Sequence, residues 1–215
     1  MAQDTMMSAD QIWRAVAAER AGLVQLLEPL SEADWDQTSL CDGWRVRDVV
    51  AHVVLSARAS IGWILINVIR ARGSLDRAIR DTAIRHTERR TTQQLLGELR
   101  DSIDARITAI GTTPADRLMD LLVHGQDIAV PLGITHDMPV AAARVAINRI
   151  WTMDAPFHAR KKFNGYRLVA TDTDWSAGVG SPITGPVAAL LLITTGRQHA
   201  WDKLTGADAA RFAQS

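Results

Sequence analysis

The sequence is poor in residues that mark several common protein classes. Of its 215 residues one is a cysteine and one a tyrosine, and 24 basic residues balance 24 acidic ones. A single cysteine, Cys41, excludes a disulfide framework and a cysteine-rich zinc site. Because a neutral chain has no overall field to attract a polyanion, we expect no nucleic-acid partner.

Long apolar runs are also missing. The longest clean run is Val187–Ile193, much shorter than the roughly 20 residues that cross a bilayer, so we expect no membrane span. The first ten residues have neither the basic nor the apolar region of a secretory signal. With 47% hydrophobic residues available for a core, the composition predicts a soluble, cytoplasmic protein.

Helical periodicity and capping signals dominate the chain as far as residue 155. Thr91 and Gln94 have the spacing of a capping box, and Thr113 followed by Pro114 is typical of an N-cap with proline at the first helical position. Long helices with short connections predict an up-and-down bundle. The expected helices cover residues 8–29, 46–72, 91–111, 113–131 and 139–153, with an arginine-rich segment from 74 onward.

The pattern changes after residue 155. Residues 166–171 are the best strand candidate, residues 172–185 have the composition of a loop, and residues 186–206 predict an apolar helix. We therefore expect a mainly α protein with two regions: a helical bundle over residues 1–155 and a small α+β appendage over residues 156–215.

Two helical segments carry the residues best suited to chemistry. Trp44, Asp48 and His52 lie four residues apart and share one helix face, and Asp120 and His124 have the same spacing. Neighbouring helices could bring His52, Asp120 and His124 together, and two imidazoles with one carboxylate suit zinc or another first-row divalent ion. The alternative is that each histidine is a hydrogen-bonded core residue.

Three residues near these segments have competing interpretations. Asp48 is expected to cap its helix or to lie on the surface. Asp127 could orient a metal ligand from behind, or it could belong to the end of its helix. Cys41 has no histidine at motif spacing, so we expect an inert small side chain.

The same segments resemble a known family. Residues 41–53, CDGWRVRDVVAHV, and residues 121–134, LLVHGQDIAVPLGI, resemble the two metal motifs of the DinB-like superfamily in its mycothiol-dependent maleylpyruvate isomerase branch. Residues 167–197 resemble the small C-terminal region of related proteins. The resemblance implies a DinB-like bundle that binds a divalent ion, usually zinc, through His52, Asp120 and His124. This chain departs from the family pattern in having Asp120 where the isomerase has Glu, and Arg45 where a Thr cap is common.

The resemblance also implies a function. The expected activity is a metal-dependent isomerisation or S-transfer on a small electrophilic substrate, with mycothiol as the low-molecular-weight thiol cosubstrate. Arg197, in the segment TTGRQ, is the candidate catalytic residue that binds an anionic group of the substrate. Two alternatives stay open: a metal-dependent hydrolase, and a non-catalytic metal-binding module of a stress response.

Overall fold

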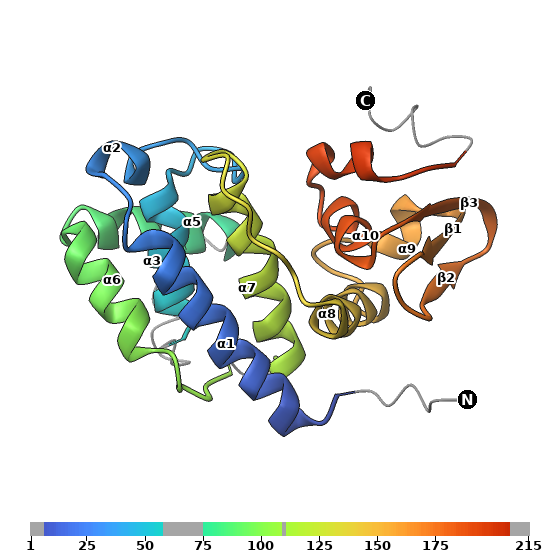
Figure 1. Cartoon of the computed structure of the whole chain (residues 1–215), viewed down its shortest axis with the longest axis horizontal. Helices are drawn as coiled ribbons and strands as arrows, with labels where there is room; N and C mark the ends of the chain where they lie inside the picture. The colour runs from blue at the N-terminus through green and yellow to red at the C-terminus, as the bar shows by residue number, and fades with distance from the viewer. Residues whose placement is uncertain (1–6, 58–74, 109–110, 207–215) are drawn as a thin grey trace. The chain divides into compact units, whose positions relative to one another are not determined.

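The computed structural model describes residues 7–57, 75–108 and 111–206, and these residues divide into two compact units. One unit covers Ala9–His136, and the other contains the described residues from Asp137 onward. The described part is mainly helical, with one small sheet near its C-terminal end (Figure 1). The expected mainly α fold with a small α+β region is therefore confirmed.

The first unit is a helical bundle. α1 packs against α6 and α7, and α3 packs against α5, α6 and α7, so that α3 and α7 are neighbours (Figure 1). Apolar side chains recurring at helical spacing fill the space between these helices, including Leu23, Val49, Leu99 and Leu122, each at most 1% exposed. The helices are α1 (Ala9–Leu27), α2 (Glu32–Trp35), α3 (Val46–Ser56), α5 (Leu75–Thr87), α6 (Thr92–Asp101) and α7 (Pro114–Ala129).

Helix starts follow the sequence signals closely. Thr91 caps α6, where its hydroxyl accepts a hydrogen bond from the Gln94 amide at 3.2 Å and the Gln94 side chain accepts one from the Thr91 amide at 3.0 Å. Thr113 caps α7 with Pro114 at the first helical position. Both starts confirm the predictions, because a capping box depends only on residues three apart.

The start of α3 is stabilised by a different residue from the usual threonine. Arg45 occupies the N-cap position, and its backbone amide donates to Asp48 Oδ2 at 3.0 Å. The Asp48 carboxylate, only 2% exposed, also accepts hydrogen bonds from the Arg45 guanidinium and from the Thr87 hydroxyl at 2.8 Å. Burial opposes ionisation of Asp48, but these bonds outweigh it and lower the pKa of the carboxyl. Asp48 therefore has the expected capping role.

One helix ends earlier than expected, and another expected helix lies mostly outside the residues that the structure describes. α6 ends at Asp101, not near residue 111, because the buried Arg20 guanidinium donates to the carbonyls of Ser102 at 2.6 Å and Ala105 at 2.8 Å. The guanidinium thus satisfies carbonyls that the end of a helix leaves without a partner in the helix. α3 is described to Ser56, and most of the expected helix 46–72 lies outside the described residues.

The second unit combines helices with a three-stranded sheet of order β2-β1-β3, in which β1 pairs antiparallel with β2 and parallel with β3. Leu168 and Ile183 are opposite each other in the register, are fully buried, and lie in the two strands that α10 contacts. The elements are α8 (Val140–Thr152), α9 (Ala159–Lys162), β1 (Gly165–Ala170), β2 (Ser176–Gly178), β3 (Gly180–Gly185), α10 (Val187–Thr194) and the 3₁₀ helix η1 (Gln198–Lys203).

The structure corrects three expectations in this unit. β1 is the predicted strand, but residues 172–185 contain β2 and β3 instead of being loop alone. The expected helix 186–206 breaks after α10, because Gly196 has φ +90° and glycine adopts that conformation without steric cost. α8 packs against α10 and belongs to this unit, whereas the sequence analysis drew the division near residue 155.

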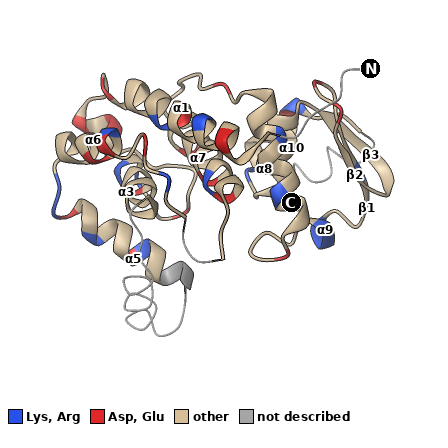
Figure 2. Cartoon of the chain, turned by 90° about the horizontal axis from the view of Figure 1, so that it is seen from below, with Lys and Arg blue, Asp and Glu red and all other residues tan. Residues whose placement is uncertain are grey.

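Acidic and basic residues are interspersed along the helices of the described part (Figure 2). No helix among the described residues is both long and apolar enough to cross a membrane.

We expect the replacement Asp48→Ala to lower the free energy of unfolding by about 1–3 kcal/mol, because it removes the buried carboxylate that accepts hydrogen bonds from the Arg45 backbone amide, the Arg45 guanidinium and the Thr87 hydroxyl. Urea unfolding followed by circular dichroism measures this. Asp34→Ala is the matched control, since Asp34 bonds the N-cap amide of α2 in the same way but is only partly buried. An equal loss in both variants would contradict a special role for Asp48.

Candidate metal centre

The three candidate ligands lie together where α3 and α7 pack side by side. His52 Nε2 is 3.3 Å from Asp120 Oδ1, and His124 Nε2 is 3.5 Å from the same oxygen. The two imidazole centroids are 4.8 Å apart at an interplanar angle of 74°. One i,i+4 pair on α7 and one residue of α3 therefore converge on a single point, and metal ligation by them remains a prediction.

The spacing of the donor atoms fits a divalent ion. Metal–ligand bonds of about 2.0–2.2 Å place the ligand atoms of a tetrahedral ion roughly 3.3 Å apart, close to the two distances at Asp120. The side chains of His52, Asp120 and His124 are 16%, 20% and 15% exposed. The three side chains are therefore partly accessible to a small molecule or ion from solvent.

The charges of the group are strongly coupled. Burial disfavours the ionised Asp120, but the charge of His52 and hydrogen bonds from both imidazoles outweigh burial and hold the pKa of Asp120 well below its ordinary range. Burial likewise disfavours the imidazolium of His124, yet hydrogen bonds to Asp120, Asp127 and Cys41 raise the pKa of His124 well above its ordinary value. At neutral pH, without an ion, His124 holds a proton that a metal must displace.

Two buried arginines add positive charge around Asp120. Arg117 NH1 lies 3.4 Å from Asp120 Oδ2, and its side chain is 9% exposed. Burial, followed by the charge of Arg117, lowers the pKa of Arg20 to about 10, so Arg20 stays charged at neutral pH. Within the described part of the chain, Arg117 Nε and two nitrogens of Arg20 have no hydrogen-bond partner. These charges offset the carboxylate that the centre buries.

Trp44 forms an apolar wall against both histidines. Its ring centroid is 5.4 Å from that of His52 and 6.3 Å from that of His124, and the residue is 7% exposed. The four-residue spacing of Trp44, Asp48 and His52 signals a shared face, but the contact with His124 on another helix needs the tertiary fold. Trp44 fixes the imidazole planes and limits water behind them.

His124 is held from behind by Asp127 and Cys41. Asp127 is fully buried, and its Oδ2 accepts hydrogen bonds from His124 Nδ1 at 2.8 Å and from the Cys41 thiol at 3.0 Å. This bond fixes the imidazole so that Nε2 faces Asp120. Cys41, His124 and Asp127 also have ligand atoms close enough for an ion, but His124 Nδ1 is engaged by Asp127, so we assign this trio to orientation.

The contacts of Cys41 were missed by the sequence analysis. Its sulfur lies 3.6 Å from His124 Nδ1, across 83 residues of sequence. The expectation of an inert small side chain did not include these contacts, and the inertness of Cys41 remains a prediction. The spacing of His124 and Asp127 signals only that these two residues share a helix face.

Arg197 belongs to the other unit. It is the N-cap of η1, directly after the break that ends α10, and its guanidinium donates to the Thr195 carbonyl at 2.7 Å. The expectation that Arg197 lies on a continuous last helix is thus corrected, and its role toward a substrate remains a prediction.

We expect Asp127→Asn to weaken zinc binding by about 10–100-fold, because the amide no longer reliably accepts the Nδ1 proton that orients His124. Titration with a competing zinc chromophore measures the affinity. Asp42→Asn, which changes an exposed carboxylate next to Cys41, is the control and should bind zinc normally. Equal affinities in all three proteins would exclude the orienting role.

The affinity for zinc should rise with pH. Because the pKa of His124 is raised, zinc must displace a proton at neutral pH, so the dissociation constant should fall by about tenfold for each pH unit gained below that pKa and then level off. Calorimetric titration in buffers of different ionisation enthalpy counts the released proton. Affinity that is constant between pH 6 and 8 would contradict the assignment.

Comparisons with known proteins bear on the family and the fold. Residues 16–119 match the family described as the Mycothiol maleylpyruvate isomerase N-terminal domain. The chain is similar in structure to the mycothiol-dependent maleylpyruvate isomerase, with a TM-score of 0.66 and 18% identity over 94% of each chain. It is equally similar to a histidine-to-alanine mutant of that enzyme, with a TM-score of 0.66 and 17% identity over 94% of each chain. No curated protein matches the sequence.

The family match covers α3, which carries His52, and the first part of α7. The match ends at residue 119, just before Asp120. The structural likeness extends the agreement in fold to almost the whole chain. The resemblance to the family is thereby confirmed: residues 16–119 belong to the family of the mycothiol maleylpyruvate isomerase N-terminal domain, and the fold of the chain is like that of the mycothiol-dependent maleylpyruvate isomerase.

Proposed function

We propose that this protein is a divalent-metal-dependent enzyme that uses a low-molecular-weight thiol, mycothiol, for isomerisation or S-transfer on a small electrophilic substrate. The observation that carries the proposal is the set of His52, Asp120 and His124 donor atoms, close together and 15–20% exposed. Zinc is the expected ion, since two imidazoles and a carboxylate suit it and leave a position for a further ligand.

Each residue of the centre has a distinct task in this proposal. The two Nε2 atoms and the Asp120 carboxylate hold the ion, while Asp127 keeps the proton on His124 Nδ1 so that Nε2 stays available. When bound, the ion lowers the pKa of a coordinated thiol or water and so supplies a nucleophile at neutral pH. Trp44 excludes water from behind the imidazoles.

The position of Cys41 favours an external thiol. A nucleophilic cysteine needs a base that can take its proton, but the Cys41 thiol donates to Asp127, and the nearest histidine nitrogen, His124 Nδ1, is engaged by the same carboxylate. No serine lies in a G-x-S-x-G context either. The chain's own nucleophiles are thus poorly activated, and a small thiol would fill the gap.

We assign to Arg197 the binding of a carboxylate on the substrate. A guanidinium pairs with a carboxylate through two parallel hydrogen bonds, which both attracts and orients it. Arg197 follows Gly196 at the break between α10 and η1. The glycine turn sets the backbone there, and the guanidinium donates to the carbonyl of Thr195, the C-cap of α10.

The activity should require both zinc and the thiol. Chelated protein is expected to lose turnover of maleylpyruvate and to regain it with zinc, and His52→Ala should lower turnover by more than about 100-fold because a ligand is lost. His158→Ala, at an exposed histidine of the other unit, is the control. Circular dichroism should show normal helix content in both variants.

The thiol is tested in the same assay by omitting mycothiol. Turnover that is equal with and without it would overturn the thiol-dependent proposal and favour a hydrolase, in which the ion activates water. Zinc binding without turnover of any electrophile would favour the non-catalytic module instead.

A further inference from the structure

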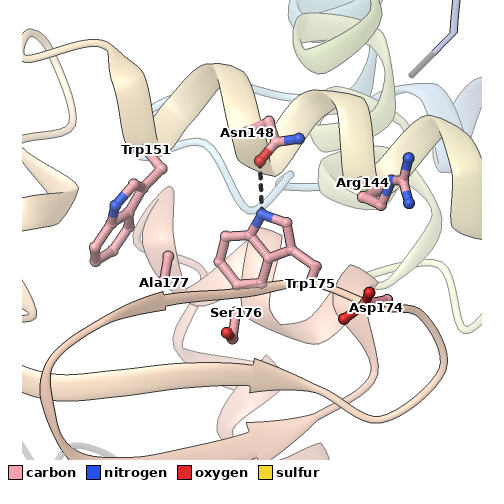
Figure 3. Close-up of a pocket in the computed structure, with 7 residues that line it drawn as sticks. All are labelled: Arg144, Asn148, Trp151, Asp174, Trp175, Ser176 and Ala177. Carbon is pink, nitrogen blue, oxygen red and sulfur yellow. Dashed lines mark hydrogen bonds between the residues drawn. The ribbon is translucent and has the colours of Figure 1, made fainter. Parts of the chain in front are cut away.

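The second unit contains a pocket that the proposed activity does not use. It has a volume of about 560 Å³, within the range of small-molecule sites. One wall is a single face of α8, where Arg144, Asn148 and Trp151 follow one another at helical spacing. The other is residues 174–177, at the beginning of β2 (Figure 3).

The aromatic part of the pocket is formed by two indoles, Trp151 and Trp175. Trp175 is 7% exposed, and its Nε1 donates to Asn148 Oδ1 at 2.7 Å. The Trp151 ring stands almost perpendicular to it, at 87° with centroids 6.4 Å apart. Since the polar atom of Trp175 is bound to α8, its ring offers apolar surface, and Trp151 adds a partly exposed indole.

The polar part offers both donors and an acceptor. Within the described residues, the Asn148 side-chain NH₂ and the Asp174 carboxylate have no hydrogen-bond partner. Asn148 uses its oxygen for Trp175, so two N–H donors remain, while Asp174 offers only acceptors. In Figure 3, Arg144 and Asp174 lie toward one end of the pocket, Trp151 at the other, and Asn148 and Trp175 between them.

This combination fits a neutral hydroxyl-rich ring better than a charged ligand. Arg144 and Asp174 carry opposite charges, so the lining has no net field that selects an anion or a cation. A sugar hydroxyl donates and accepts at once, which matches a carboxylate beside an amide, and the C–H face of a sugar ring is apolar enough to pack on an indole. One carboxylate without histidine or cysteine is a poor metal site.

From these observations we propose that the pocket between α8 and β2 binds a neutral saccharide, with Trp151 against the ring face and Asp174 and Asn148 bonding its hydroxyls. This site is independent of the metal centre: its lining lies wholly in the second unit. Nothing in the proposal depends on zinc or thiol chemistry.

Saturation-transfer NMR and calorimetry on the full chain test the proposal with glucose, galactose, mannose, N-acetylglucosamine, maltose and cellobiose. At least one of them should bind saturably, and Trp151→Ala should weaken it by about tenfold or more. Trp13→Ala, which removes a half-buried indole of the other unit, should not change binding.

A second variant guards against a folding defect at Trp151. Asp174→Asn changes an exposed side chain and should weaken the same sugar, whereas Asp202→Asn, at an exposed carboxylate of η1, should not. Failure of all six sugars to bind would overturn the proposal. So would binding that survives both pocket variants, or tighter binding of gluconate, glucosamine or free amino acids than of any neutral sugar.

Discussion

The carboxylate of Asp120 lies between the imidazoles of His52 and His124, and the candidate centre depends on keeping these three side chains partnered. Burying a carboxylate among apolar helices is costly unless positive charge and hydrogen-bond donors compensate it. Here two imidazoles and the Arg117 guanidinium do so. The same demand makes the cluster a good ligand set, because a divalent ion supplies the compensating charge in a more compact form.

Two further buried aspartates hold the helices that carry the ligands. Asp48 caps the start of α3, one turn before His52, and bonds Thr87 at the end of α5. Asp127 bonds the imidazole of His124 one turn later on α7 and, through the thiol of Cys41, the loop before α3. Each carboxylate thus links a ligand helix to a second segment, so that the ligand positions are set by bonds on both helices and not by packing alone.

The two units differ in the kind of side chain that they bury. The bundle places polar groups inside and satisfies them, as with Arg20, fully buried and bonded to the carbonyls after α6. In the second unit α10 is apolar on nearly all sides and is covered by α8, β1, β3 and η1. That unit also buries Thr194 and Thr195, whose hydroxyls donate to carbonyls of α10, while Asn148 and Asp174 line the pocket beside the two indoles.

Features that depend on residues close together in the chain were predictable from the amino-acid sequence. Helix starts at Thr91 and Thr113, the shared face of Asp120 and His124, and the strand at Gly165–Ala170 all follow from residues within one or two turns of each other. The resemblance to the family motifs also allowed the candidate metal ligands to be predicted, because these residues lie within two short segments.

Other features could be seen only in the folded protein, because the residues that interact there are far apart in the chain. The end of α6 is set by Arg20, some 80 residues earlier, and the surroundings of Cys41 by residues 83 and 86 positions later. β2 and β3 have loop-like compositions and become strands only by pairing with β1. A helix cap is a local hydrogen bond and can be found from spacing, whereas a strand edge or a buried guanidinium depends on what folding brings beside it.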